Sequence, residues 1–248
     1  MDKISLIYKL SLIIGAIANL LMAASLFAGQ KVYRRYTIYS RARKFTILWL
    51  AAFAVGYLIH AALDLRASWP TAAASLTVSY FHLGAICFCW GYIPLLNPNY
   101  LTRKIAVRDT VIYALGLTAC WTTAMITKQT SVYTLIPSLV FFSYCAYNTV
   151  VFYKTFQRVS FRLLVMSYGN VRSFVRWLQL SCDIIIFFGI FLVAVMLLLP
   201  DAVRYITPAE TIAGIGLFGY IVHSLSKYGK VVEEASRATE NIAEFDNN

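Results

Sequence analysis

The sequence is built from long apolar segments separated by short polar connections. A helix needs about 20 mainly apolar residues to cross the hydrocarbon core of a bilayer. Seven segments meet this requirement, at residues 5–28, 45–65, 71–94, 110–127, 131–153, 177–199 and 206–226. The pattern therefore predicts an all-α bundle of seven transmembrane helices over residues 1–226. Residues 227–248 follow as a short amphipathic or coiled-coil tail.

Composition supports a membrane protein over the other classes. Of the 248 residues, 60% are hydrophobic and 13% are charged, whereas soluble domains carry about 25% charged residues. A water-soluble globule would leave too much apolar surface in water, and a disordered chain would need far more polar residues. The lipid bilayer is the first expected partner.

The basic residues are concentrated in alternate connections. Most of the 22 lysines and arginines lie in residues 30–44, 97–109, 154–176 and the tail. Cytoplasmic loops collect lysine and arginine, so we expect the N-terminus outside and the C-terminus in the cytoplasm. The first segment is interpreted as a retained helix. Most of the net charge of +11 then reflects topology and headgroup contact, and direct binding of nucleic acid is not expected.

Ionisable side chains within membrane helices are costly and mark candidate functional sites. Several of them fall near the predicted outer ends of helices, where an external ligand would enter. Arg66 would add a charge there, and Tyr57, Tyr80 and Trp69 would add aromatic walls. The predicted ligand-binding residues are His60, Asp64, Tyr80, His82 and Glu210.

A second polar site is expected at the inner ends of the last two membrane segments. Asp183 and His223 lie at similar depth there, and an unpaired Asp183 would be costly. We predict a polar contact of Asp183 with His223 or with a nearby tyrosine or asparagine. The three histidines of the chain lie at different depths, and its five cysteines are scattered through the helices. Neither a metal ion nor a cofactor is therefore predicted.

The tail after the seventh segment has a heptad-like stripe with charged flanks. One interpretation is an amphipathic helix lying on the headgroups, and the other is a short signalling or dimerisation helix. In the second, the seam residues would be Leu225, Val232, Ala235 and Ile242. The basic connection 156–176 has two interpretations as well. It forms either extensions of the flanking helices with a break at Gly169 and Asn170, or an interfacial helix.

Two stretches of the chain resemble the membrane sensor region of regulators from Bacteroides-type bacteria. They are Tyr80–Tyr92, followed by Leu95–Lys104, and Tyr220–Tyr228, which runs into a glutamate-rich helix. In that family a multi-helix membrane region is joined to a cytoplasmic helix-turn-helix DNA-binding domain. The resemblance covers most of the chain, which ends where the output domain would begin. It implies a bacterial inner (cytoplasmic) membrane as the location, and no ligand or DNA-reading residue is carried over.

These features together favour a sensor or receptor-like signalling module without enzymatic activity. An outer-face or intramembrane stimulus would shift the sixth and seventh segments, and the tail would relay this shift to a homodimer mate or a cytoplasmic partner. The alternative is a small transporter or channel with Asp183, His223 and His82 as a polar track. A lipid-modifying enzyme is a third alternative.

Overall fold

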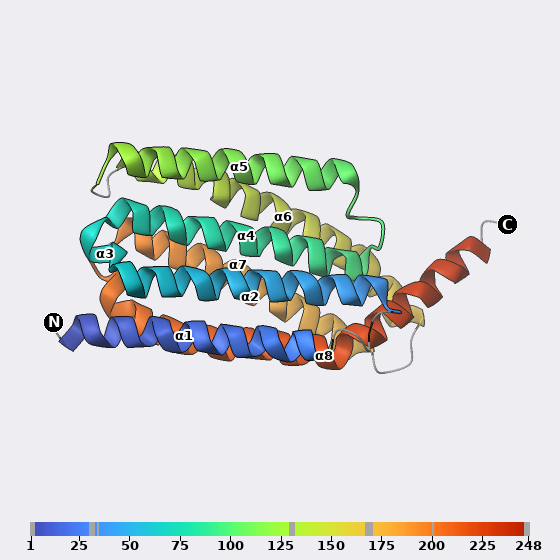
Figure 1. Ribbon diagram of the computed structural model, residues 1–248. Helices are drawn as coiled ribbons and strands as arrows, with labels where there is room; N and C mark the ends of the chain where they lie inside the picture. Colours follow the sequence, from blue (N-terminus) through green and yellow to red (C-terminus); the bar gives the residue numbers. More distant parts are fainter. Residues whose placement is uncertain are drawn as a thin grey trace.

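The computed structural model describes residues 3–29, 33, 35–128, 132–166, 171–199 and 201–245. Of these, it gives 132–135, 159–166, 171–175, 196–197, 228–232 and 234–245 through their backbone alone. The described residues form eight helices (Figure 1), namely α1 (Lys3–Ala28), α2 (Thr37–Leu63), α3 (Leu65–Ser68), α4 (Pro70–Leu96), α5 (Arg103–Ile126), α6 (Val132–Met166), α7 (Val171–Leu198) and α8 (Val203–Phe245).

Seven of the helices in the described part of the chain are long and apolar enough to cross a membrane. They coincide with the seven apolar segments of the sequence, so the prediction of a multi-pass helical bundle is confirmed. Three helices begin at least six residues before their apolar segments, α2 at Thr37, α5 at Arg103 and α7 at Val171. Hydropathy marks the part of a helix that lipid surrounds, whereas the hydrogen-bonded helix continues into polar sequence.

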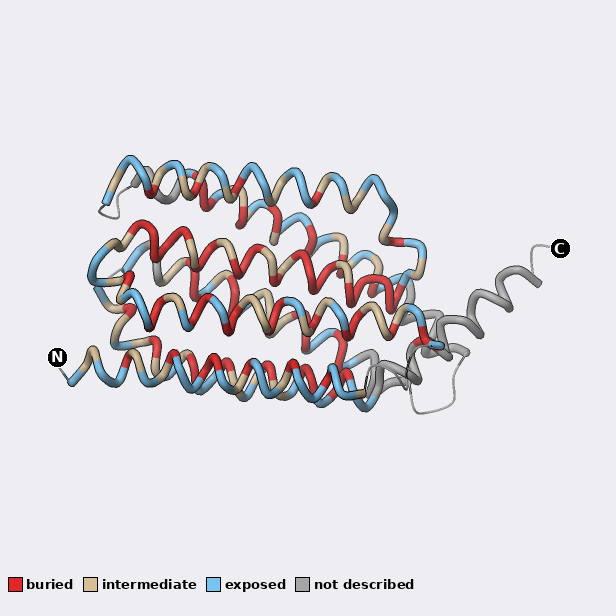
Figure 2. The backbone as a smooth tube through the Cα atoms, viewed as in Figure 1, coloured by how far each residue is buried: buried red, intermediate tan, exposed pale blue. Residues whose placement is uncertain are grey.

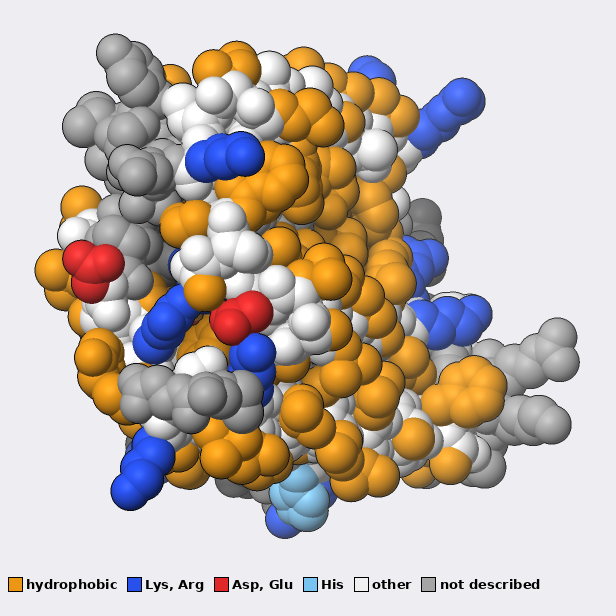
Figure 3. Space-filling model, turned by 60° about the vertical axis from the view of Figure 1, so that its left-hand side comes forward, with side chains coloured by type: hydrophobic (Ala, Val, Ile, Leu, Met, Phe, Trp, Pro, Cys, Tyr) orange, Lys and Arg blue, Asp and Glu red, His pale blue; other side chains and the backbone are white. Residues whose placement is uncertain are grey.

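The surface of the bundle has the character expected in lipid. Large hydrophobic side chains are exposed along its flanks, including Leu21 at 66%, Met125 at 76% and Ile212 at 72%. A soluble monomer rarely exposes contiguous apolar surface on this scale. Figure 3 shows the same feature as hydrophobic side chains spread over the flank of the molecule.

Helix α4 lies at the centre of the bundle. It packs against α2, α5, α6, α7 and α8, and Figure 2 shows buried residues along most of its length. An aromatic cluster fills the space between α4 and its neighbours. The Phe53 ring packs edge-on against the rings of Tyr57, Tyr80, Phe81 and Phe218, with centroids 4.8–6.3 Å apart. Such edge-to-face pairs add stabilisation beyond the burial of their area.

The two ends of the bundle differ. The N-terminus and α3 lie at one end, the α3 end, whereas α8 projects beyond the other end, the tail end (Figure 1). Helix α8 is continuous from the membrane segment into the tail, so the expected domain boundary at residue 226 falls inside one helix. Likewise, α6 extends to Met166 and α7 begins at Val171. The connection 156–176 thus consists mainly of helix extensions, and the expected break at residues 169–170 lies outside the described residues.

Candidate functional site

Six helices converge on a cavity of about 30 Å³, which we call the α3-end pocket. Helices α1, α2, α3, α4, α7 and α8 all contribute side chains to it. Its wall is unusually polar for a membrane protein, since it includes Tyr57, His60, Arg66, Thr77, Tyr80 and Glu210. On this end of the bundle, acidic and basic side chains lie side by side (Figure 3).

A hydrogen-bond network centred on Thr77 fixes part of the pocket wall. The Thr77 hydroxyl donates to the Ala73 carbonyl oxygen at 2.9 Å, which occupies its only hydrogen. Its oxygen must therefore accept from its other partners, which are Arg66 Nη2 at 3.2 Å, His60 Nε2 at 3.1 Å and, more distantly, the Tyr80 hydroxyl at 3.5 Å. In a neutral imidazole this tautomer leaves His60 Nδ1 as an acceptor.

Several polar groups of the pocket have no hydrogen-bond partner in the described part of the chain. His60 Nδ1, an acceptor, and Arg66 Nε, a donor, are both buried and unpartnered. The Tyr57 hydroxyl and the Glu210 carboxyl likewise form no hydrogen bond with a described residue. Native proteins pair most of their buried polar groups. A cluster of unpaired groups around one cavity therefore indicates a place where water or a small polar ligand completes the bonding.

Two glycines make room for the aromatic walls of the pocket. A Cβ added at Gly56 would lie 2.4 Å from Tyr80 Cδ1. One added at Gly15 would lie 2.8 Å from the Tyr57 ring. The rings of Tyr57 and Tyr80 therefore lie directly against bare backbone, with their centroids 6.0 Å apart. The small residues of α1 and α2 act here as close-packing positions.

The structure brings together only part of the predicted ligand-binding set. His60, Tyr80 and Glu210 line the α3-end pocket. Asp64 does not line it: the residue ends α2 in the left-handed conformation, at φ 48°, and its carboxylate lies 3.1 Å from Lys9 Nζ. In this ion pair the positive charge of Lys9 and the negative charge of Asp64 neutralise each other beside the pocket. Trp69 donates to the Ala124 carbonyl oxygen at 3.0 Å and does not line the pocket either.

His82 lies apart from the other candidates. Its ring packs among those of Tyr113, Phe141 and Tyr144, with centroids 4.9–5.8 Å away. The side chain is 2% exposed, and its Nε2 has no hydrogen-bond partner in the described residues. His82 is therefore a buried aromatic packing residue between α4, α5 and α6 and does not reach the α3-end pocket.

The expected contact of Asp183 with His223 does not form. The Asp183 carboxylate accepts a hydrogen bond from the Tyr153 hydroxyl of α6, which is one of the alternatives considered for it. The His223 side chain is exposed on α8. Among the seam residues of the tail, Leu225 is fully buried inside the bundle. The side chains of Val232, Ala235 and Ile242 lie outside those that the structure describes.

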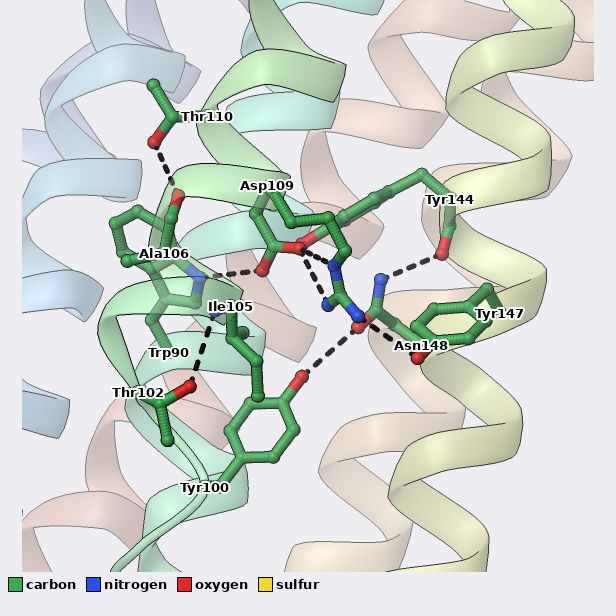
Figure 4. A network of polar contacts seen from close by, with 11 residues as sticks. Trp90, Tyr100, Thr102, Ile105, Ala106, Asp109, Thr110, Tyr144, Tyr147 and Asn148 are labelled. Carbon is green, nitrogen blue, oxygen red and sulfur yellow. Dashed lines mark hydrogen bonds and ion pairs between the residues drawn. The ribbon is translucent and has the colours of Figure 1, made fainter.

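A network around Asp109, at the tail-end half of α5, was not anticipated from the sequence (Figure 4). The Asp109 side chain is fully buried and accepts from Trp90 Nε1 at 2.8 Å and from Arg108 Nε at 2.9 Å. Arg108 also donates to the Tyr147 hydroxyl at 3.0 Å. Asp109 stood at the border of a basic connection, so the sequence pattern assigned it to a loop.

The Tyr100 hydroxyl extends the polar contacts of this region towards the tail end. It donates to Asn148 Oδ1 at 3.3 Å (Figure 4). Burial raises the pKa of the Tyr100 hydroxyl, so the group keeps its proton and acts as a donor throughout the ordinary pH range. Asn148 in turn donates to the Tyr144 carbonyl oxygen. These bonds join the α4–α5 connection to α6.

A second unanticipated contact ties the tail to α2. The Glu233 side chain is fully buried, and its Oε2 accepts from the backbone N–H of Tyr39 at 2.9 Å. Tyr39 is the third residue of α2, whose N-cap residue Tyr36 provides no side-chain cap. A carboxylate at this position satisfies a free N–H and is favoured by the helix dipole. Residues far apart in sequence thus form an N-terminal cap, which neither local pattern indicates.

Arg43 lies beside this contact on α2. It is 2% exposed, donates to the Leu26 carbonyl oxygen at the end of α1, and donates to the Tyr39 hydroxyl at 3.1 Å. Its guanidinium lies 4.9 Å from the centroid of the Tyr33 ring. A cation at the C-terminus of α1 is favoured by the helix dipole. The C-terminus of α1, the first turns of α2 and the tail are therefore joined in one polar cluster.

A larger cavity, of about 60 Å³, lies among α2, α4, α6, α7 and α8, but its chemistry is apolar. Aromatic and aliphatic side chains form most of its wall. The Asn148 side chain at its edge already donates to the Tyr144 carbonyl oxygen and accepts from Tyr100. Cavities of this kind stay dry and lack the charges that select a polar ligand. The α3-end pocket is therefore the stronger candidate site.

Comparisons of the chain with protein-family models, curated proteins and solved structures give no match. The resemblance to membrane-bound regulators therefore stays a prediction. Among the described residues, no three histidine, cysteine, aspartate or glutamate side chains come together as a metal site. The fold and the geometry of the α3-end pocket are thus the basis for a functional proposal.

Proposed function

We propose that this protein is a membrane sensor in which the α3-end pocket receives a stimulus and α8 relays it to the tail. The observation that carries the proposal is the course of α8. One unbroken helix, Val203–Phe245, carries Glu210 in the pocket and Glu233 at the N-terminus of α2. The two glutamates are 23 residues apart, or about 35 Å along a helix.

A helix of this kind couples its two ends mechanically. A tilt or axial shift of α8 that repositions Glu210 would also displace Glu233, because the intervening backbone is hydrogen-bonded throughout. Helix α7 lines the pocket through Leu192 and Val195, so it would share in the movement. The contact between Glu233 and Tyr39 then serves as the readout, since a hydrogen bond is lost over a displacement of about 1 Å.

The distribution of charge supports an orientation with the pocket outside the cell. Connections at the tail end carry most of the lysines and arginines, which favours a cytoplasmic tail in a bacterial inner membrane. An external stimulus would then enter at the α3 end. The tail would present the signal to a second copy of the chain or to a cytoplasmic partner. The role proposed is binding and relay, without a catalytic step.

The transporter alternative is less favoured by the geometry. Its polar track would need Asp183, His223 and His82 along one path. His82 lies among aromatic rings, Asp183 pairs with Tyr153, and His223 is exposed. These positions do not share a cavity in the described part of the chain.

Pulsed electron spin resonance in lipid nanodiscs tests the relay. Spin labels at Lys44, which is exposed on α2, and at Thr239 in the tail would report the distance between the two, in a background lacking the five native cysteines. We expect Arg66→Gln and Glu210→Ala to shift the distance distribution. Asp201→Asn is the matched control, because Asp201 is an exposed carboxylate just before α8. Unchanged distances in both pocket variants would overturn the sensor proposal.

A further inference from the structure

The surroundings of Glu210 combine one opposing charge with several hydroxyl groups. Arg66 of α3 acts on the Glu210 carboxyl electrostatically, although no hydrogen bond joins the two groups. Helix α1 contributes Tyr8 and α4 contributes Tyr80, whereas α7 contributes only the apolar Leu192 and Val195. From α2 come Tyr57 and His60. The remaining charged groups nearby are the paired Lys9 and Asp64, and Asp201 and Arg204 before and at the start of α8.

The pocket has the size and the polarity needed for water. A cavity of about 30 Å³ accommodates about two water molecules, each of which requires two to four polar partners. His60 Nδ1, Arg66 Nε, the Tyr57 hydroxyl and the Glu210 carboxyl provide these partners. Glu210 is half-buried, so its carboxyl is neither sealed into the core nor free in bulk solvent.

We propose that the ligand of the α3-end pocket is the proton, and that Glu210 binds it from the external medium through water in this cavity. The inference rests on the proposed sensor function and names its stimulus. In the binding step, a hydronium ion transfers its proton to the Glu210 carboxylate, which becomes a neutral carboxylic acid while the hydronium becomes water. One O–H bond of the hydronium breaks as the O–H bond of the carboxyl forms, and no other bond changes.

Proton binding changes the force between α3 and α8. A carboxylate opposite Arg66 attracts the guanidinium and holds α8 towards α3, and a neutral carboxylic acid does not. Charges that face each other in a partly desolvated site interact more strongly than in water. Low external pH therefore releases the α3 end of α8, and the Glu233 contact with α2 reports the release at the other end.

His60 is the other titratable group of the pocket within reach of water. It is 2% exposed, and its Nε2 is committed to Thr77. A charged imidazole would stand near the Arg66 guanidinium, which repels it. A protonated Glu210 is neutral, so Arg66 does not repel it. The geometry therefore favours Glu210 over His60 as the proton acceptor.

The test repeats the spin-label measurement between Lys44 and Thr239 from about pH 8 to about pH 3, a range that covers the titration of glutamate in proteins. We expect the native sequence to change its distance distribution with a single midpoint. Glu210→Gln should show the low-pH distribution at every pH, because its amide is neutral throughout. Asp201→Asn should titrate as the native sequence does, and Glu210→Asp should titrate with a displaced midpoint.

Infrared difference spectroscopy provides a direct readout. The native protein should gain C=O absorption of protonated carboxyls over the same pH range, and Glu210→Gln should lack the component that Glu210 contributes to it. A pH response that persists in Glu210→Gln would overturn the assignment to Glu210. The distance distribution of the native protein could stay the same at every pH while Glu210→Gln still shifts it. That result would overturn proton sensing but not the sensor proposal. A tail that neither pH nor any pocket variant moves would overturn the sensor proposal as well.

Discussion

The Asp109 network and the α3-end pocket are both clusters of ionisable side chains inside the helical bundle, and they differ in how these groups are paired. Asp109 accepts hydrogen bonds from Trp90 and Arg108, and Arg108 also donates to Tyr147. In the pocket, Glu210, Tyr57 and parts of His60 and Arg66 have no hydrogen-bond partner among the described residues. The carboxylate of the first cluster has its hydrogen-bond donors within the protein, whereas the Glu210 carboxylate of the second has none among the described residues.

This difference distinguishes the two clusters more clearly than burial or residue type does. Both sites contain an arginine, a carboxylate and several tyrosines. A charge whose partners are supplied by the fold stabilises helix packing, and it gains nothing from a ligand. A charge left with free bonding capacity beside a cavity can change its state when a ligand or a proton arrives. The two clusters therefore predict different responses to the same kind of substitution.

The largest effect is expected at Asp109. Asp109→Ala removes the acceptor of the Trp90 N–H and of Arg108, whose side chain is 35% exposed, and a hydrogen bond to a charged group is worth about 1.5–3 kcal/mol. The free energy of unfolding, measured by denaturant titration in bicelles, should fall by this amount. The Tyr147→Phe variant removes only the outer hydrogen bond and should cost about 1 kcal/mol. If Asp109→Ala unfolds like the native protein, the network does not hold α4 to α5.

The walls of the pocket are expected to be less tolerant than its charges. Gly56→Ala places a methyl group 2.4 Å from the Tyr80 ring, and overpacking of this kind costs about 1–3 kcal/mol. Gly216→Ala is the matched control, because an added Cβ there meets nothing within 4 Å. Both the unfolding free energy and the pH response of the tail should change in Gly56→Ala. Neither should change in Gly216→Ala. Equal effects of the two would show that Tyr80 is free to move.

The contact between the tail and α2 should give a smaller and more local effect. Glu233→Gln keeps an acceptor for the Tyr39 N–H but removes the charge at the helix N-terminus, which is worth about 0.3–1 kcal/mol. We expect faster hydrogen exchange at the first turn of α2, measured by mass spectrometry, with little change elsewhere. Glu234→Gln is the matched control at the neighbouring position. Unchanged exchange in Glu233→Gln would mean that the cap is not populated in the membrane.

The helices and part of the pocket follow from the sequence, because hydropathy records which segments lipid surrounds. His60 and Glu210 were found because ionisable residues are unusual in membrane segments, and Tyr80 was found as an aromatic wall of the same site. Asp109 and Glu233 were missed because each stands in a polar stretch, where a charged residue carries no signal. Their burial depends on a partner far along the chain, such as Tyr39 for Glu233. Only the three-dimensional packing identifies a charge that is buried at the border of a membrane segment.

The smallest change in stability is expected for Glu210→Gln, and it is the sharpest test of the comparison. The Glu210 carboxyl forms no hydrogen bond with a described residue, is half-buried and faces a polar cavity. Water in such a cavity screens its attraction to Arg66, so the unfolding free energy should change by less than about 1 kcal/mol. The same carboxyl-to-amide exchange at Asp109 should cost more, because Arg108 loses its charged partner there. If both variants lose equal stability, Glu210 is a structural ion-pair residue and the pocket does not differ in kind from the Asp109 network.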